Sequence, residues 1–354
     1  MTHKLKTPPL LSMTRCMAFS TMLILTGCAS SPGDNDPGKR PDWVDGNSSH
    51  YPREQYIIGR GQADRLSRAQ DIARANIAKT FQVNIHERST DTQQIKQTSD
   101  EQGTRSSRDA RIRRHIITET DQIIDGIEIA DVWQNPDTGQ YYTLAILSRH
   151  QASTRLRQDI EQLDKATMKS IAASRASDDA LTQAGFAAQA LMAQQQRAAY
   201  QKMASIIDLS GRGVTPRWQL AQLESDLDSL LGRIHIQAVS LTADKTGQAL
   251  TSVLTGALTV AGITPGDENN SDYILTGQLE LTDLGLRDGW HWQRASVQIE
   301  LTDKTGGQLR GNQSWNKLKA AGLDSSIARQ RLLKQVEETL KNDLRQTLID
   351  MAMP

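Results

Sequence analysis

The side chains of this chain that could carry out chemistry are few and far apart. The chain has two cysteines, Cys16 and Cys28, both near its start. Its seven histidines, at positions 3, 50, 86, 115, 150, 235 and 291, never lie within four residues of one another. A zinc site recognisable from sequence needs such ligands at short spacing, so we predict no metal site. Because no Gly-x-Ser-x-Gly elbow is present either, we expect that the chain is not an enzyme.

Two short patterns carry a weaker chemical signal. Residues 59–64 begin like a dinucleotide fingerprint after a strand, but Asp64 replaces the third glycine and its charge would repel a pyrophosphate. We interpret this segment as a tight strand-to-helix turn. The tetrapeptide Asp-Lys-Thr-Gly occurs at 244–247 and at 303–306. It is similar to the phosphorylated-aspartate loop of ion-pumping ATPases, but the hydroxyl residue that should follow is missing, so we predict two turns.

The most specific signal lies at Leu25, Thr26, Gly27 and Cys28, which end a short apolar run after a basic segment. This pattern resembles the lipobox of bacterial lipoproteins, in which signal peptidase cuts before the cysteine. The resemblance implies that Cys28 carries covalent diacylglycerol on its sulfur and an N-acyl lipid such as palmitate, with no other cofactor. The apolar core is about ten residues long, too short to span a membrane. We expect residues 1–27 to be the signal peptide; the alternative is an ordinary signal peptide with an incidental cysteine.

The residues after the cysteine indicate where the chain would be held. Residue Ala29 is not aspartate, and in Gram-negative lipoproteins that difference implies the periplasmic face of the outer membrane. Residues 28–40 are polar and rich in proline and glycine, which predicts a flexible tether. The chain has 41 basic and 41 acidic residues, and this balance argues against a nucleic-acid partner.

The elements that follow predict an α+β domain over residues 41–150. We expect a strand at 56–61, a helix at 67–80 and an alternating strand at 81–86, then strands at 123–133 and 141–147 around a turn. Several residues in this region form a recognisable set: Pro41, Trp43, Gly59, Gly61, Ala63, Ala69, Ala73, Ala75, Ala78, Trp133, Tyr141, Tyr142, Leu144 and Ala145. The set is similar to the LPP-twenty family of envelope lipoproteins. That resemblance implies a non-enzymatic outer-membrane protein serving a flagellar or other envelope assembly.

The rest of the chain predicts a second domain beyond a helical connector. Residues 151–232 indicate a helical hairpin that turns near 173–178, followed by a shorter helix from Trp218 to Leu231. Residues 233–354 predict a C-terminal β-α-β-β-β-α domain. The fold class is therefore α+β, with two small sheet-plus-helix domains joined by an α-helical hairpin. The residues Asp272, Tyr273, Leu275, Gly277, Asp303 and Gly306 make the last domain similar to penicillin-binding-protein activators and curli-secretion lipoproteins.

Two groups of side chains are candidate partner contacts. Arg111, Arg113 and Arg114 crowd a basic stretch that is either a solvated face or a surface for lipid headgroups or an acidic partner. On an unbroken strand, Trp290 and Trp292 point away from the face that buries Ala295. They would then form an exposed edge for a protein partner or a glycan. A bulge near Gln293 or Arg294 would instead return both indoles to the core.

We therefore predict an outer-membrane lipoprotein that works as a periplasmic interaction or assembly factor. It would hold an unidentified envelope protein, in a flagellar or secretion-associated structure, and a homo-oligomer is a further alternative. Activation of a peptidoglycan synthase is the runner-up function. An envelope hydrolase is the alternative of another class, and it would need a cleft with perturbed carboxylates or a Ser-His pair.

Overall fold

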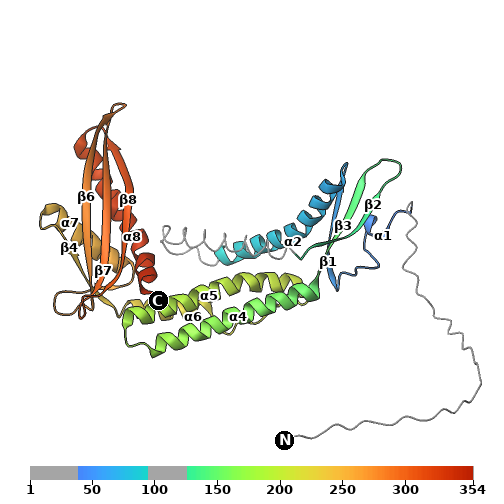
Figure 1. Cartoon of the computed structure of the whole chain (residues 1–354), viewed down its shortest axis with the longest axis horizontal. Helices are drawn as coiled ribbons and strands as arrows, with labels where there is room; N and C mark the ends of the chain where they lie inside the picture. Colours follow the sequence, from blue (N-terminus) through green and yellow to red (C-terminus); the bar gives the residue numbers. More distant parts are fainter. Residues whose placement is uncertain (1–38, 95–125, 354) are drawn as a thin grey trace, which may run out of the picture. The chain divides into compact units, whose positions relative to one another are not determined.

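A computed structural model describes residues 39–94 and 126–353. From Arg40 onward the chain forms one compact unit. Its described residues form seven helices and two sheets, one of three strands and one of five (Figure 1). The α+β fold class predicted from the sequence is confirmed.

The N-terminal sheet has three antiparallel strands. In chain order the elements are α1 (Asp42–Asp45), β1 (Tyr56–Ala63), α2 (Leu66–Gln94), β2 (Glu128–Gln134) and β3 (Tyr141–Ser148). The strand order β1-β3-β2 places the third strand in the middle. The predicted turn between β2 and β3 is confirmed: the Asn135 side chain accepts the backbone N–H of Asp137, and Gly139 has a φ of +68°.

Strand β1 and helix α2 approach so closely that their contact requires glycine. A Cβ atom on Gly61 would lie 1.9 Å from the carbonyl oxygen of Ala69, and one on Gly59 would lie 2.3 Å from that of Ala73. Both glycines lie inside β1, so the tight strand-to-helix turn predicted at 59–64 lies later, at Asp64 and Arg65. The pattern instead removes side chains where a helix backbone lies directly on a strand.

The strand predicted at 81–86 is also wrong, because α2 continues through this segment to Gln94. Phe81 is buried at the same helical spacing as Ala69, Ala73 and Ile77. It extends the three- and four-residue repeat of the helix by one more turn. The alternation that begins at Phe81 therefore overlaps a helical repeat, and the longer pattern determines the structure.

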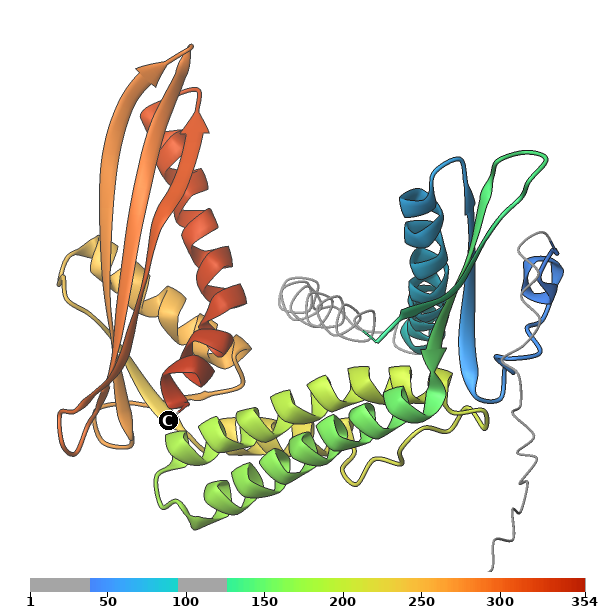
Figure 2. The same ribbon diagram turned by 45° about the vertical axis from the view of Figure 1, so that its right-hand side comes forward.

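The predicted helical hairpin and the shorter helix are confirmed as α4 (Arg149–Ala176), α5 (Ala180–Ile207) and α6 (Leu220–Leu231). Figure 2 shows α4 and α5 side by side and antiparallel. Two side chains cap the pair: the Ser148 hydroxyl accepts the N–H of Gln151, and the Asp179 carboxylate accepts that of Thr182. Helix α6 packs on α5.

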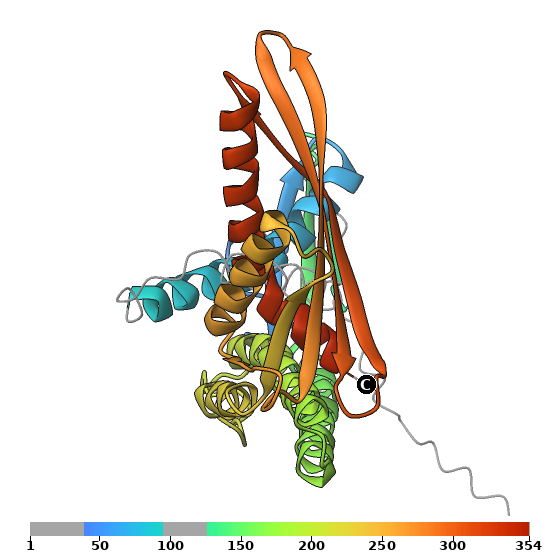
Figure 3. The same ribbon diagram turned by 90° about the vertical axis from the view of Figure 1, so that its left-hand side faces the viewer.

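The C-terminal sheet has the strand order β5-β4-β6-β7-β8. Its elements are β4 (His235–Ser240), α7 (Lys245–Val260), β5 (Thr264–Pro265), β6 (Tyr273–Arg287), β7 (Trp290–Asp303), β8 (Leu309–Gly322) and α8 (Ser325–Ala352). Strands β4, β5 and β6 pair in parallel, whereas β6, β7 and β8 are antiparallel. Figure 3 shows α7 and α8 on one face of this sheet.

The two copies of Asp-Lys-Thr-Gly adopt different structures. At 303–306 the predicted turn is confirmed, because the Asp303 carboxylate accepts the backbone N–H groups of Thr305 and Gly306. At 244–247 the prediction is wrong: Asp244 caps the N-terminus of α7 by accepting the N–H of Gly247. The apolar helical repeat that follows the first copy explains the difference.

Helices α4 and α5 contribute to the apolar cores at both ends of the hairpin. The core under the N-terminal sheet receives Leu156, Ile160, Tyr200 and Met203. The core of the C-terminal sheet receives Leu181, Ala184, Ala188 and Leu191. The hairpin is therefore fixed by packing at each end.

Candidate functional site

Several residues predicted from the sequence lie outside the described residues. These are the lipobox residues Leu25, Thr26, Gly27 and Cys28, and the basic residues Arg111, Arg113 and Arg114. Their roles stay predictions.

Strand β7 carries the two predicted tryptophans on the face opposite the helices. Trp290 is 41% exposed and Trp292 is partly exposed, while Ala295 is buried. Gln293 is buried on the helix side, where its amide donates to the Ser325 hydroxyl. The β6–β7 pairing shifts register beside Gln293, but the extra residue lies on β6 between Asp283 and Gly285. Strand β7 itself has no bulge at 293 or 294, so that alternative is wrong. Both indoles point away from the core.

Two exposed leucines lie at the same end of the sheet as Trp290. Leu286 is 63% exposed and pairs with His291, and His291 in turn pairs with Gly322, one residue before Leu323, which is 69% exposed. Leu286 shares the face of its partner His291 and so lies on the opposite face of the hairpin from Trp290. We call Trp290 and Trp292 the tryptophan edge. Clustered exposed apolar side chains mark surfaces that bind a partner.

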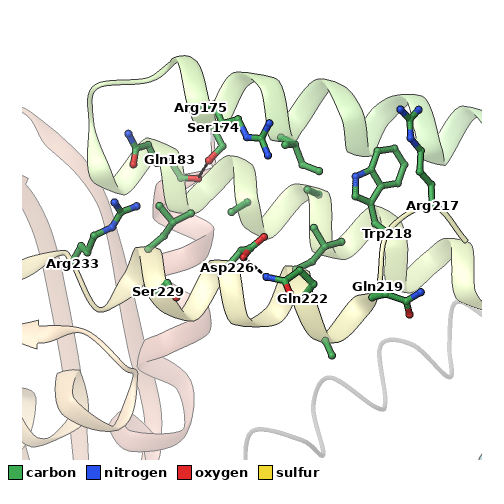
Figure 4. A pocket seen from close by; sticks show the side chains of 16 residues that line it. Ser174, Arg175, Gln183, Arg217, Trp218, Gln219, Gln222, Asp226, Ser229 and Arg233 are labelled. Carbon is green, nitrogen blue, oxygen red and sulfur yellow. Dashed lines mark hydrogen bonds between the residues drawn. The ribbon is translucent and has the colours of Figure 1, made fainter.

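A second surface lies between the helices, in a groove that we call the α5 groove. It has a volume of about 1140 Å³, with α5 between α4 and α6 at its base (Figure 4). The residues that line it are Ile171, Ser174, Arg175, Gln183, Ala187, Ala190, Arg217, Trp218, Gln219, Ala221, Gln222, Leu223, Asp226, Ser229, Leu230 and Arg233.

Two alanines of α5 lie at the base of the groove, Ala187 partly buried and Ala190 fully buried. Ala187 and Ala190 lie on the stretch of α5 that faces the space between α4 and α6. The apolar side chains Ile171 and Leu230 contribute to its sides, from α4 and α6 respectively. In Figure 4, Trp218 lies toward the end of the groove opposite Arg233. The groove therefore offers an apolar base with polar groups around it.

The charges around the groove are unbalanced. Three arginines line it, Arg175, Arg217 and Arg233, and none of them forms an ion pair within the described part of the chain. The Arg217 guanidinium lies 5.1 Å from the ring centroid of Trp218. The single lining carboxylate, Asp226, accepts a hydrogen bond of 2.8 Å from Gln222. The groove thus carries a net positive charge on groups that are free to bind an anion.

A buried arginine holds the segment that supplies Arg217 and Trp218. The Arg197 side chain on α5 is 2% exposed, and its Nε donates to the Asp164 carboxylate on α4 at 2.9 Å. Its Nη2 donates to the backbone carbonyls of Val214 and Thr215 at 3.2 and 3.0 Å. Charge-assisted hydrogen bonds of this kind fix both partners. Arg197 therefore fixes the chain just before the groove.

A second charged cluster fixes the other end of α5 to the C-terminal sheet. The Asp179 carboxylate accepts hydrogen bonds from the Tyr273 hydroxyl, from Thr182 and from Arg310, the last at 2.6 Å. Burial raises the pKa of Asp179, but these hydrogen bonds and the charge of Arg310 outweigh burial and hold the pKa below its ordinary value. Burial and the neighbouring carboxylate raise the pKa of Tyr273. Asp179 therefore stays ionised and Tyr273 neutral at physiological pH.

In residues 39–94 and 126–353, no three or more Cys, His, Asp and Glu side chains gather in a way that could hold a metal ion. No helix in the same residues is both long and apolar enough to cross a membrane.

Sequence reasoning found the tryptophan edge but missed the α5 groove. The groove requires α6 to pack on α5, and contacts between helices far apart in sequence leave little local pattern. The one local signal is the pair Arg217 and Trp218 beside an alanine-rich helical hairpin. A cation next to an indole at the start of a helix could have indicated a binding surface.

Comparison with known proteins supports the family suggested by the sequence. Residues 41–148 match the model of the LPP20 lipoprotein family, in agreement with the predicted resemblance over 41–150. No curated protein is significantly similar to the chain in sequence. The similarity of the C-terminal domain to penicillin-binding-protein activators and curli-secretion components stays a prediction.

Three solved structures show low similarity to this chain. The secreted protein HP1454 from Helicobacter pylori is 14% identical, covers 84% of this chain and 97% of that chain, and has a TM-score of 0.35. The minor lipoprotein from Acinetobacter baumannii is 15% identical, covers 33% and 89%, and has a TM-score of 0.24. Lipoprotein GNA1162 from Neisseria meningitidis is 12% identical, covers 32% and 99%, and has a TM-score of 0.25.

Proposed function

We propose that this chain, which carries an LPP20 lipoprotein domain at residues 41–148, is a lipid-anchored protein of the bacterial envelope that binds a protein partner. The family match is the observation that carries the proposal. The matched residues 41–148 directly follow the predicted tether at 28–40, as expected for the first domain of an anchored lipoprotein. The partner would belong to an assembly of the envelope.

The anchor is the lipid on Cys28. Each methylene of an acyl chain contributes about 0.8 kcal/mol to membrane binding, so several chains on one residue hold a protein permanently at the bilayer. With alanine at position 29, the outer membrane is the expected destination. The tether predicted at 28–40 would give the folded part freedom to reach neighbouring proteins.

Binding rather than catalysis is supported by the kinds of surface that the chain presents. The tryptophan edge presents exposed apolar groups, and the α5 groove combines apolar groups with unpaired cations, as protein-binding surfaces do. The carboxyl groups with shifted pKa values among the described residues are Asp42, Glu161, Asp179 and Asp208, and all four shift downward. The general acid of a hydrolase needs a raised pKa. These carboxylates are suited to structural hydrogen bonds.

Metabolic labelling tests the anchor. Cells expressing the full chain or Cys28→Ala are grown with an alkyne analogue of palmitate, and the chain is purified and scored for label. We expect label in the wild type, none in Cys28→Ala, and release of the variant from the membrane fraction. Cys16→Ala is the matched control and should label as the wild type does. Equal labelling of wild type and Cys28→Ala would overturn the proposal.

A further inference from the structure

We infer that the α5 groove binds an acidic amphipathic helix of a partner protein. The inference rests on the geometry and charge of the groove and does not depend on the lipid anchor. The groove lies near the turn end of the helical hairpin, between the end of α4, the first half of α5 and α6, and is separate from the tryptophan edge.

The size of the groove favours a peptide segment over a small molecule. Pockets for small ligands have volumes of roughly 300–1,000 Å³ and enclose most of the ligand. The α5 groove reaches about 1140 Å³ and lies open along the helices (Figure 4). An elongated occupant that leaves one side in solvent fits such a shape.

The three helices around the groove favour a helical occupant. Helices α4 and α6 both pack on α5, and the space between them lies above Ala187 and Ala190. A further helix lying in that space would complete a four-helix arrangement, with its apolar residues at helical spacing against Ile171 and Leu230. Proteins use this arrangement widely to bind the apolar face of an amphipathic helix.

The charges specify an acidic occupant. Arg175, Arg217 and Arg233 come from three different segments, the end of α4, the loop before α6 and the residues after α6. Guanidinium groups bind carboxylates through paired hydrogen bonds, so Glu or Asp side chains along the helix would find partners on both sides of the groove. The single carboxylate of the groove, Asp226, is already bound to Gln222. A basic helix would leave the arginines unpaired and face them with like charge.

The groove is held in shape before any partner arrives. Arg197 fixes the segment that leads to Trp218 through its bonds to Asp164 and to two backbone carbonyls. At the other end, Asp179 fixes the start of α5 to Tyr273 and Arg310. A preformed site avoids part of the ordering cost that binding otherwise carries.

The test is a titration of the purified full chain in detergent micelles with three fluorescent peptides, read by anisotropy. Each peptide has about 18 residues, or about five helical turns. The first has leucine and alanine on one helical face and glutamate on the other. The second replaces every glutamate by lysine, and the third contains the residues of the first in scrambled order. We expect the first to bind at least about tenfold more tightly than either of the others.

Two sets of variants locate the binding. The test variant changes Arg175→Glu, Arg217→Glu and Arg233→Glu together, and it should weaken the acidic peptide by at least about tenfold. The matched control changes Arg68→Glu, Arg155→Glu and Arg294→Glu, which alters net charge equally at three exposed sites away from the groove. The control should bind as the wild type does. Ala187→Trp, which fills the groove without changing charge, should also abolish binding, and circular dichroism checks that each variant folds.

Three results would overturn the inference. Equal binding of the scrambled acidic peptide would show that the groove does not recognise an apolar helical face. Equal losses in the test and control arginine variants would show a general charge effect. Arginine-dependent binding of phosphatidylglycerol vesicles that displaces the acidic peptide would assign the groove to a lipid surface.

Discussion

Two faces of helix α5 use small residues to opposite effect. On one face a Cβ atom on Gly185 would lie 2.1 Å from the carbonyl oxygen of Ala352, so α5 and the end of α8 are in backbone contact. Two residues further along, Ala187 lines an open groove. At Gly185 the small residue allows another backbone to pack directly on α5. At Ala187 the neighbouring helices are further apart, and the small residue leaves a groove.

The arginines of the same region also fall into two groups, according to whether they form an ion pair. Arg197 is buried and bound to a carboxylate and two carbonyls, whereas Arg175, Arg217 and Arg233 surround the groove without an ion pair among the described residues. The buried arginine maintains the structure, and the three at the groove are available to a ligand. The two groups should therefore respond differently to mutation.

Replacing the buried arginine should have the largest effect on stability. Arg197→Ala leaves the Asp164 carboxylate without its cation and two carbonyls without a donor, and we expect a loss of about 3 kcal/mol in the free energy of unfolding. Urea denaturation followed by circular dichroism measures the change. Arg175→Ala is the control from the groove, and it should stay within about 0.5 kcal/mol of the wild type. Similar losses in both variants would remove the distinction between the two groups.

Enlarging the closed face of α5 should have an intermediate effect. Gly185→Leu places a side chain against the backbone of α8, and we expect a loss of about 1–3 kcal/mol despite the better helix propensity of leucine. Ala187→Leu on the open face should change stability by no more than about 0.5 kcal/mol. The same denaturation experiment compares the two. A larger loss for Ala187→Leu than for Gly185→Leu would contradict the assignment of closed and open faces.

The smallest effect should be a pH dependence at the start of α5. Because the folded structure lowers the pKa of Asp179 below 3.8, its contribution to stability is present above that value and is lost as pH falls through the folded-state pKa. Asp179→Asn keeps a capping side chain but removes the charge. We expect the urea midpoints of wild type and Asp179→Asn to differ at neutral pH and to converge as the pH falls below 3.8 and through the lower folded-state pKa. Asp178→Asn, at the neighbouring exposed residue, is the control and should have the urea midpoint of the wild type at every pH. A difference between wild type and Asp179→Asn that stays constant with pH would contradict the assigned role of the Asp179 charge.

Local signals in the sequence predicted most of the elements. The turn at 135–139 and the repeats of α5 and α8 each depend on residues within a few positions of one another. Two of the errors arose where one local pattern is compatible with two structures. Phe81 fits both an alternating strand and a helical repeat, and Asp-Lys-Thr-Gly serves both as a turn and as a helix cap.

The candidate surfaces differ in how far sequence could predict them. The tryptophan edge follows from the two-residue alternation of one strand, so Trp290 could be placed on the outer face in advance. The α5 groove depends on how α6 packs on α5 and on a bond from Arg197 to carbonyls 17 and 18 residues away. That packing decides which arginines form no ion pair, and the spacing of residues in the sequence alone does not predict it.

The most direct measurement is site-specific photo-crosslinking in cells. A photoreactive amino acid replaces Ala221, an exposed residue that lines the groove, or Ala249, an exposed residue on α7, in the otherwise native full chain. We predict a crosslinked protein from position 221 that is absent from position 249 and is lost when Arg175, Arg217 and Arg233 are changed to glutamate. Equal crosslinking from both positions, or a product from position 221 that persists without the three arginines, would contradict a partner-binding role for the open face of α5.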